Sequence, residues 1–247
     1  MKFPGFRPWK SSTRQVVLAI AATGLVVVPH VFAAPMPTTW DHLVRVKAKQ
    51  FDQVYLLPGA DFRAYTKVLI DPVQVTFRKD WQRNLNNSTS DLSRRISNED
   101  AAKIAERTRA GATKIFTDAF RAAGYEIVTE PAPDALRIAP NIIDLYITAP
   151  DTMSAGRSRT YTMEAGEATL ALEVRDSASG ELLGRAVDRE RAGDNGMRLS
   201  WTTDVTNTAD FERLYRRWAA QSVKGLQKLK EQSPLGPDGK PATAAAR

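Results

Sequence analysis

The chain of 247 residues carries 35 lysines and arginines against 28 aspartates and glutamates, which gives a formal net charge of +7. It contains no cysteine and two histidines. Disulfides, zinc–thiolate sites and cysteine nucleophiles are therefore excluded, and we expect neither a metal nor another cofactor.

The N-terminal segment has the pattern of a signal peptide. An apolar run of 13 residues, 16–28, follows a stretch whose charged residues are all basic, namely Lys2, Arg7, Lys10 and Arg14. A run of this length suits a signal peptide, whereas a membrane-spanning helix needs about 20 residues. Residues 31–33 fit the small-x-small cleavage rule, and cutting after Ala34 would leave an unfavourable N-terminal Pro35. We therefore predict cleavage after Ala33; a buried helix or an uncleaved anchor is the alternative.

Cleavage after Ala33 changes what the charge implies. It removes four basic residues and no acidic one, which lowers the net charge from +7 to +3 and argues against a nucleic-acid partner. His42 then remains as the single histidine, so a serine–histidine–aspartate triad would depend on one residue near a terminus. Without a cysteine we expect no lipid anchor, and after cleavage no transmembrane helix. These features predict an exported protein, either periplasmic or secreted.

The mature chain divides into a lead-in at 34–50, a single domain at 51–231 and a tail at 232–247. The tail is rich in Pro, Gly and Ala, and we expect it to be disordered. Alternating apolar residues predict a strand at 68–77 that Pro72 interrupts. Residues 97–100 resemble a capping box, and a helical apolar stripe continues from there to Gly124. Further alternations predict strands at 125–129, 143–147 and 168–174.

A hairpin follows the last of these strands. A three-residue loop at 178–180, with Gly180 in the left-handed conformation, would pair Ser177 with Glu181. That register places Glu173 opposite Arg185, whereas a four-residue loop would turn Arg185 onto the core face. We favour the first register because it pairs opposite charges and keeps the arginine out of the core.

The last helix has the clearest pattern. Asn207 is its predicted N-cap, and one apolar face continues for about five turns. This face consists of Phe211, Leu214, Tyr215, Trp218, Ser222, Leu226 and Leu229. The order of elements predicts an α+β fold with two layers, a largely antiparallel sheet and two long helices packed on one face.

The sequence lacks the motifs of common enzyme classes. It has no glycine-rich phosphate loop, no GxSxG, no HExxH and no SxxK. Carboxylates are available for acid–base chemistry at Asp71, Glu173, Asp188 and Glu190. Glu173 already has a partner in the predicted hairpin, so we expect no enzyme. The alternative is a carboxylate-based hydrolase of an envelope polymer, which would need two acidic residues close together in one pocket.

Two segments are candidate contact surfaces. A basic ribbon on the last helix lies on a face distinct from the apolar one and consists of Arg213, Arg217, Lys224 and Lys228. It could dock on a phosphorylated glycolipid, an anionic lipid or an acidic partner, or it could be a solvated face. The second segment, 78–96, carries Trp81, Arg94 and Arg95. Trp81 could anchor a partner or fold back on the sheet, and the segment could also be disordered.

Three stretches together resemble a known family. They are Trp40 to Leu43 with Tyr55 to Phe62, then Val68 to Val73, then Arg175 to Glu181. In that order, and over most of residues 40–231, they resemble the bacterial envelope proteins catalogued as domain of unknown function 3313 (DUF3313). The resemblance implies a lipoprotein-like envelope protein with no established activity, although this chain has no cysteine to carry a lipid. The element order is also similar to that of small envelope-assembly modules, such as the N-terminal domain of the Tol system's periplasmic protein.

These observations predict an exported, non-catalytic binding or scaffolding module of the bacterial envelope. Its expected partner is an unknown envelope protein or an anionic glycolipid. A binder of anionic lipid or glycolipid that uses the basic ribbon is a further hypothesis, beside the hydrolase.

Overall fold

The structure, a computed structural model, describes residues 39–88, 95–148, 160–162, 165–193, 200–202 and 204–242, with the backbone alone at 160–162, 200–202 and 204–207. All of them lie in the compact unit Pro37–Arg247. The predicted cleavage site at Ala33 and Ala34 lies outside these ranges, as does Arg94. Among the helices that the structure describes, none is long and apolar enough to cross a membrane.

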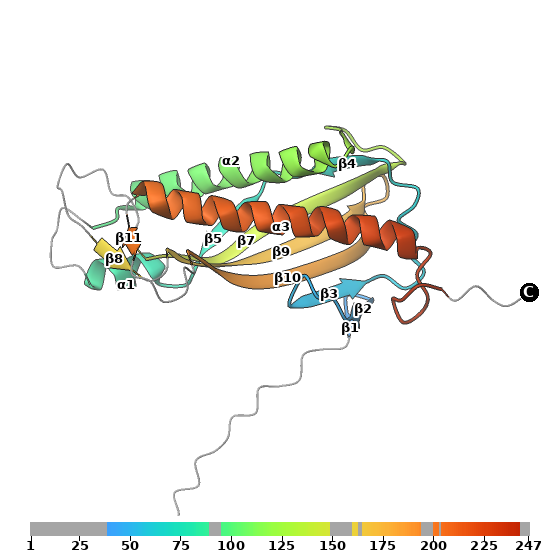
Figure 1. Ribbon diagram of the computed structural model, residues 1–247, viewed down its shortest axis with the longest axis horizontal. Helices are drawn as coiled ribbons and strands as arrows, with labels where there is room; N and C mark the ends of the chain where they lie inside the picture. Colours follow the sequence, from blue (N-terminus) through green and yellow to red (C-terminus); the bar gives the residue numbers. More distant parts are fainter. Residues whose placement is uncertain are drawn as a thin grey trace, which may run out of the picture. The chain divides into compact units, whose positions relative to one another are not determined.

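The described residues form an α+β fold with one large, mostly antiparallel sheet and three helices, as Figure 1 shows. The strands are β1 (Thr39–Trp40), β2 (Leu43–Val46), β3 (Gln53–Leu56), β4 (Lys67–Ile70), β5 (Gln74–Phe77), β6 (Glu126–Ile127), β7 (Ala135–Ile147), β8 (Thr160–Thr162), β9 (Gly166–Asp176), β10 (Leu182–Ala192) and β11 (Ser200–Thr202). The helices are α1 (Trp81–Asn87), α2 (Asn98–Ala122) and α3 (Asp204–Gln232). The sequence prediction of an α+β class with a largely antiparallel sheet is confirmed.

The large sheet has the order β1-β2-β3-β10-β9-β7-β4-β6, and β5 also pairs with β7. In the part β1-β2-β3-β10-β9-β7, all neighbouring strands are antiparallel. In contrast, β4 and β5 run parallel to β7, and β6 runs parallel to β4. The break between β4 and β5 falls at Pro72, as predicted. β8 and β11 form a separate pair.

Helix α2 begins at the predicted capping box. The Ser97 hydroxyl accepts a hydrogen bond from the backbone N–H of Asp100, and the Asp100 carboxylate accepts one from the backbone N–H of Ser97. Two N–H groups that the helix itself cannot satisfy are thereby bonded. α2 contacts β4, β5 and β6, α3 contacts β10, and the two helices lie side by side (Figure 1).

Helix α3 begins at Asp204, three residues before the predicted cap at Asn207. Its predicted apolar face is buried as far as Leu226, and Leu229 is half-buried. Trp218 is fully buried on this face and donates its indole N–H to the carboxylate of Asp188 on β10, at 2.8 Å. The helix is therefore attached to the sheet by a buried hydrogen bond as well as by apolar packing.

The β9–β10 hairpin has the predicted pairing of Glu173 with Arg185 but reaches it differently. The Asp176 N–H donates to the Glu181 carbonyl at 2.9 Å, so the turn has four residues, 177–180, instead of three. A bulge between Leu182 and Gly184 then shifts the register by one residue. The extra residue in the bulge compensates for the extra residue in the loop. Arg185 is therefore paired with Glu173, as the shorter loop without a bulge would also have paired it.

Both ends of the domain extend beyond the expected bounds. Residues 39–46, expected to be part of a lead-in, form β1 and β2 and join the sheet. Asp41 and His42 both have positive φ and form the two-residue turn between these strands. After α3, Leu235 is buried and donates its backbone N–H to the Ala60 carbonyl at 2.9 Å. Residues 233–242 thus pack on the domain, in contrast to the disordered tail expected from their composition.

Candidate functional site

Trp81 does not form a contact surface. It is 2% exposed, its ring stacks on Phe77 with centroids 4.2 Å apart, and its indole N–H donates to the Ile147 carbonyl at 3.0 Å. This corrects the hypothesis of a partner anchor and agrees with the alternative, that Trp81 folds back on the sheet. The Asn86 amide bonds both backbone groups of Ile96, so this part of the segment is held in place by its own side chains.

The five described basic residues among the proposed contacts lie at exposed positions, but they do not form one cluster. Arg213 forms an ion pair with Asp210 on the same helix, and Arg217 forms one with Glu190 of β10. Within the described ranges no ion pair involves Lys224 or Lys228, which lie further along α3. Arg95 is exposed and lies before α2. Only Arg213 and Arg217 therefore contribute to a common site.

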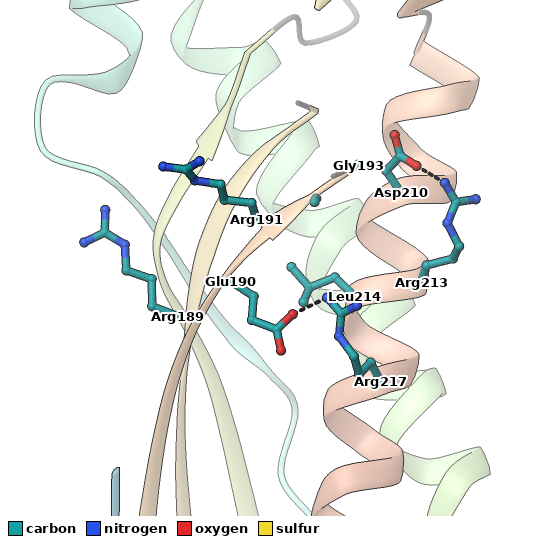
Figure 2. A pocket seen from close by; sticks show the side chains of 9 residues that line it. Arg189, Glu190, Arg191, Gly193, Asp210, Arg213, Leu214 and Arg217 are labelled. Atoms are coloured by element: carbon teal, nitrogen blue, oxygen red, sulfur yellow. Dashed lines mark hydrogen bonds and ion pairs between the residues drawn. The ribbon is translucent and has the colours of Figure 1, made fainter. Parts of the chain in front are cut away.

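A groove of about 580 Å³ lies between α3 and the end of β10 (Figure 2). Its lining residues are Arg189, Glu190, Arg191, Ala192 and Gly193 from β10 and the residue after it, and Asp210, Arg213, Leu214 and Arg217 from α3. Four of these residues are arginines, but only Arg213 and Arg217 lie on the α3 side, where each forms an ion pair with one of the two carboxylates. Leu214 and Ala192 are buried and give the groove an apolar part.

The four arginines lie on two sides of β10. Figure 2 shows Glu190 pointing toward Arg217, while Arg189 and Arg191 point away from α3. The alternation of side chains along a strand explains this arrangement. On its side of β10, Arg189 donates to the Glu167 carboxylate at 2.8 Å. On the α3 side, Arg217 reaches across to Glu190 of the strand, and Arg213 lies along its own helix toward Asp210.

Asp188 and Glu190, two residues apart on β10, each bind one residue of α3: Trp218 and Arg217, respectively. Asp188 is 5% exposed, and besides Trp218 it accepts a hydrogen bond from the Asp52 N–H at 3.0 Å. Glu190 forms the ion pair with Arg217. Burial raises the pKa of Glu190 above its usual value; Arg217 opposes this rise, and the neighbouring Asp188 carboxylate adds to it. Glu190 therefore takes up a proton more easily than an ordinary glutamate.

Gly193 allows the end of β10 to approach α3. Its φ is +80°, and a Cβ atom at this position would lie 2.7 Å from an Asp210 carboxylate oxygen and 3.1 Å from the Ala165 nitrogen. Any side chain would therefore be strained in its backbone conformation and would displace the Asp210 carboxylate.

The chemistry of the groove suits an anionic ligand. Guanidinium groups bind carboxylate and phosphate oxygens through paired N–H donors, and each ion pair of Arg213 and Arg217 uses one terminal nitrogen. In the described part of the chain, no group of three or more histidines and carboxylates could hold a metal ion. The sequence placed Arg213 and Arg217 on one helix face and offered Glu190 as an available carboxylate, but it did not bring Glu190 to them, and it did not mark Asp210, Arg189 or Arg191 as site residues.

The comparison with curated proteins found no match. Among solved structures, the PelC dodecamer from Paraburkholderia phytofirmans is 12% identical over 70% of this chain and 96% of that chain, with a TM-score of 0.34. Protein XCC0632 from Xanthomonas campestris is 10% identical over 71% and 89%, with a TM-score of 0.35. A homologue of a neuraminyllactose-binding hemagglutinin from Helicobacter pylori is 14% identical over 70% and 91%, with a TM-score of 0.28.

The comparison with family models gave a match over most of the chain. The model of DUF3313, described as a protein of unknown function, matches residues 37–222. This range includes the three stretches that carry the resemblance, together with β10 and the part of α3 that lines the groove. The chain therefore belongs to the DUF3313 family.

Proposed function

We propose that this chain is an exported, non-catalytic binding module of the bacterial envelope, and that the groove between β10 and α3 binds the anionic headgroup of a lipid or glycolipid. The observation that carries the proposal is the pair of arginines on the helix side of the groove, Arg213 and Arg217, each of which has one acidic partner and at least half of its side chain exposed. Arginine suits phosphate-bearing ligands because its planar donors match the oxygens in pairs. A volume of about 580 Å³ also lies within the usual range of small-ligand pockets, about 300–1,000 Å³.

The proposal includes the finer architecture and location expected from the sequence. In it, α2 and α3 form a second layer on one face of the sheet, which the contacts of α2 with β4 and β5 and of α3 with β10 support. The signal pattern at 1–33 supports export to the periplasm, with secretion as the alternative.

Vesicle binding tests this function with a matched pair of variants. Arg213→Gln with Arg217→Gln should weaken sedimentation with phosphatidylglycerol vesicles at least about tenfold, because one charge-assisted hydrogen bond contributes about 1.5–3 kcal/mol. Lys224→Gln with Lys228→Gln makes the same change of net charge on the same helix outside the groove, and it should retain binding.

Three controls complete the vesicle experiment. Phosphatidylcholine vesicles should not bind, and circular dichroism with thermal melting should show that both double variants are folded. Equal losses in the two double variants would contradict a groove site, since they would point to a general attraction between the basic helix and the membrane.

The second candidate is the carboxylate-based hydrolase. It is favoured by one observation, the raised pKa of Glu190 beside Asp188 in a groove that also holds Asp210. Against it, both carboxylates that line the groove are paired with arginines. Product release from peptidoglycan by the wild-type chain that stops in Glu190→Gln would establish the enzyme. Absence of product from both would leave the binding module as the better account.

A further inference from the structure

Glu190 binds one of the two arginines on the α3 side of the groove. Its carboxylate forms the ion pair with Arg217 across the groove, from strand to helix (Figure 2). The other pair, Asp210 with Arg213, lies within α3, and the Arg213 side chain is 64% exposed. An anion that enters the groove can thus reach Arg213 directly. To bind all the N–H donors of Arg217, however, it must compete with Glu190.

We propose that Glu190 is an internal competitor of the anionic ligand: the ligand displaces the Glu190 carboxylate from Arg217, and Glu190 takes up a proton as it leaves. The inference rests on the proposed function of the groove. It adds to that function a residue that sets the affinity and a linkage between ligand binding and pH.

The surroundings of Glu190 explain the proton. From α3, Arg217 faces it, and Asp210 and Arg213 line the same groove. From its own strand, Asp188 lies beside it; Asp188 is buried and already bonded to Trp218 and to the backbone of Asp52.

Arg217 is the cation that opposes the effects of burial and of the Asp188 carboxylate on Glu190. Once a ligand binds Arg217, a charged Glu190 would remain partly buried next to Asp188 without that partner, which is unfavourable. Protonation removes this charge. No other described group is needed for the step, since the proton comes from the solvent.

Calorimetric titration of the full mature chain tests the linkage. Two probes are used, inorganic pyrophosphate and phosphatidylglycerol vesicles, each in two buffers of different ionisation enthalpy so that protons taken up are counted. Relative to Glu190→Gln, wild-type affinity should fall as the pH rises, by up to about tenfold per pH unit for one linked proton. Glu190→Gln should bind more tightly than the wild type at neutral pH and take up one proton fewer, so that only the pH dependence of the probe itself remains.

Glu173→Gln is the matched control. It removes the same charge from another arginine-paired glutamate, one that does not line the groove. It should keep the wild-type pH slope and proton uptake above about pH 5, where Glu173 stays ionised. If both variants tighten binding equally, or if Glu190→Gln weakens it, the proposal that Glu190 competes with the ligand is wrong.

The outcomes separate this inference from the function on which it rests. Binding with the same pH slope and the same proton uptake in the wild type and in Glu190→Gln would overturn the competitor and leave the binding module intact. Absence of binding in every variant to both probes would overturn both. Uptake of a proton with vesicles but no binding of pyrophosphate would support the competitor and identify the ligand as a membrane headgroup rather than a free phosphate.

Discussion

The arginines of this protein differ in how completely their donors are used. Arg185 binds Glu173 at 2.6 Å and Asp41 at 2.9 Å, and its guanidinium lies 3.9 Å above the centre of the Trp40 ring. Its side chain is only 10% exposed. Such an arginine holds strands together and has little capacity left for a ligand. Arg213 and Arg217 have one acidic partner each and at least half of the side chain exposed, which makes the groove the better binding site.

Glu173, one of the partners of Arg185, makes a contribution to the stability of the fold that is lost in acid. Burial opposes the charge of Glu173, but the Arg185 and Arg175 guanidiniums outweigh it and lower the pKa of Glu173 below the usual 4.5. Because the pKa is lower in the folded than in the unfolded state, the stabilisation is present above the unfolded pKa and is lost as the pH falls through the folded pKa.

We expect Glu173→Gln to remove this part of the pH dependence. The measurement is the free energy of unfolding from urea titrations between about pH 3 and 7. The wild type should lose stability more steeply below about pH 4.5 than the variant does. Parallel pH profiles for the two proteins would show that the ion pairs of Glu173 contribute nothing to stability.

At the scale of elements, local patterns predicted what depends on neighbours in the sequence. The capping box of α2, the apolar face of α3 and the register of Glu173 with Arg185 follow from spacing and charge. The bulge at 182–184 was not predictable in the same way, because two loop lengths reach one register when a bulge adds a residue. The favoured three-residue loop was therefore wrong although its pairing was right.

Burial that depends on distant partners was harder to predict. For Trp81 the sequence left folding back on the sheet as one alternative, and its bond to the distant Ile147 backbone agrees with that alternative. The residues after α3 show the same limit. Their composition is that of a disordered tail, yet Leu235 bonds to Ala60, and the Ser233 hydroxyl accepts a hydrogen bond from the Phe62 N–H at 3.0 Å. No neighbouring residue in the sequence announces either contact.

Substitution of Leu235 tests whether this segment is part of the fold. Leu235→Ala should lower the free energy of unfolding by about 2–5 kcal/mol, because it removes a buried side chain. Lys240→Ala, exposed in the same segment, should change it by less than about 0.5 kcal/mol. Chemical denaturation measures both. Equal and negligible effects would return residues 233–242 to the disordered tail that the composition suggested.

At the scale of the whole molecule, the candidate site joins segments that are far apart in the sequence. Helical spacing alone predicted that Arg213 and Arg217 share a face, and it grouped them with Lys224 and Lys228. It could not show that β10 brings Glu190 to Arg217, because that contact depends on how α3 crosses the sheet. Tertiary structure thus divides the ribbon into a groove-lining pair and a pair outside it, and this division makes the binding hypothesis testable.

The most direct test of a groove that binds anions is the arginine side-chain NMR spectrum of the mature chain during titration with pyrophosphate. We expect the Nε–H resonances of Arg213 and Arg217 to shift in a saturable way, while those of Arg175 and Arg185, which bind Glu173, stay unchanged. A spectrum in which Arg213 and Arg217 do not move, or in which all exposed arginines shift together without saturation, would contradict a groove that binds anions.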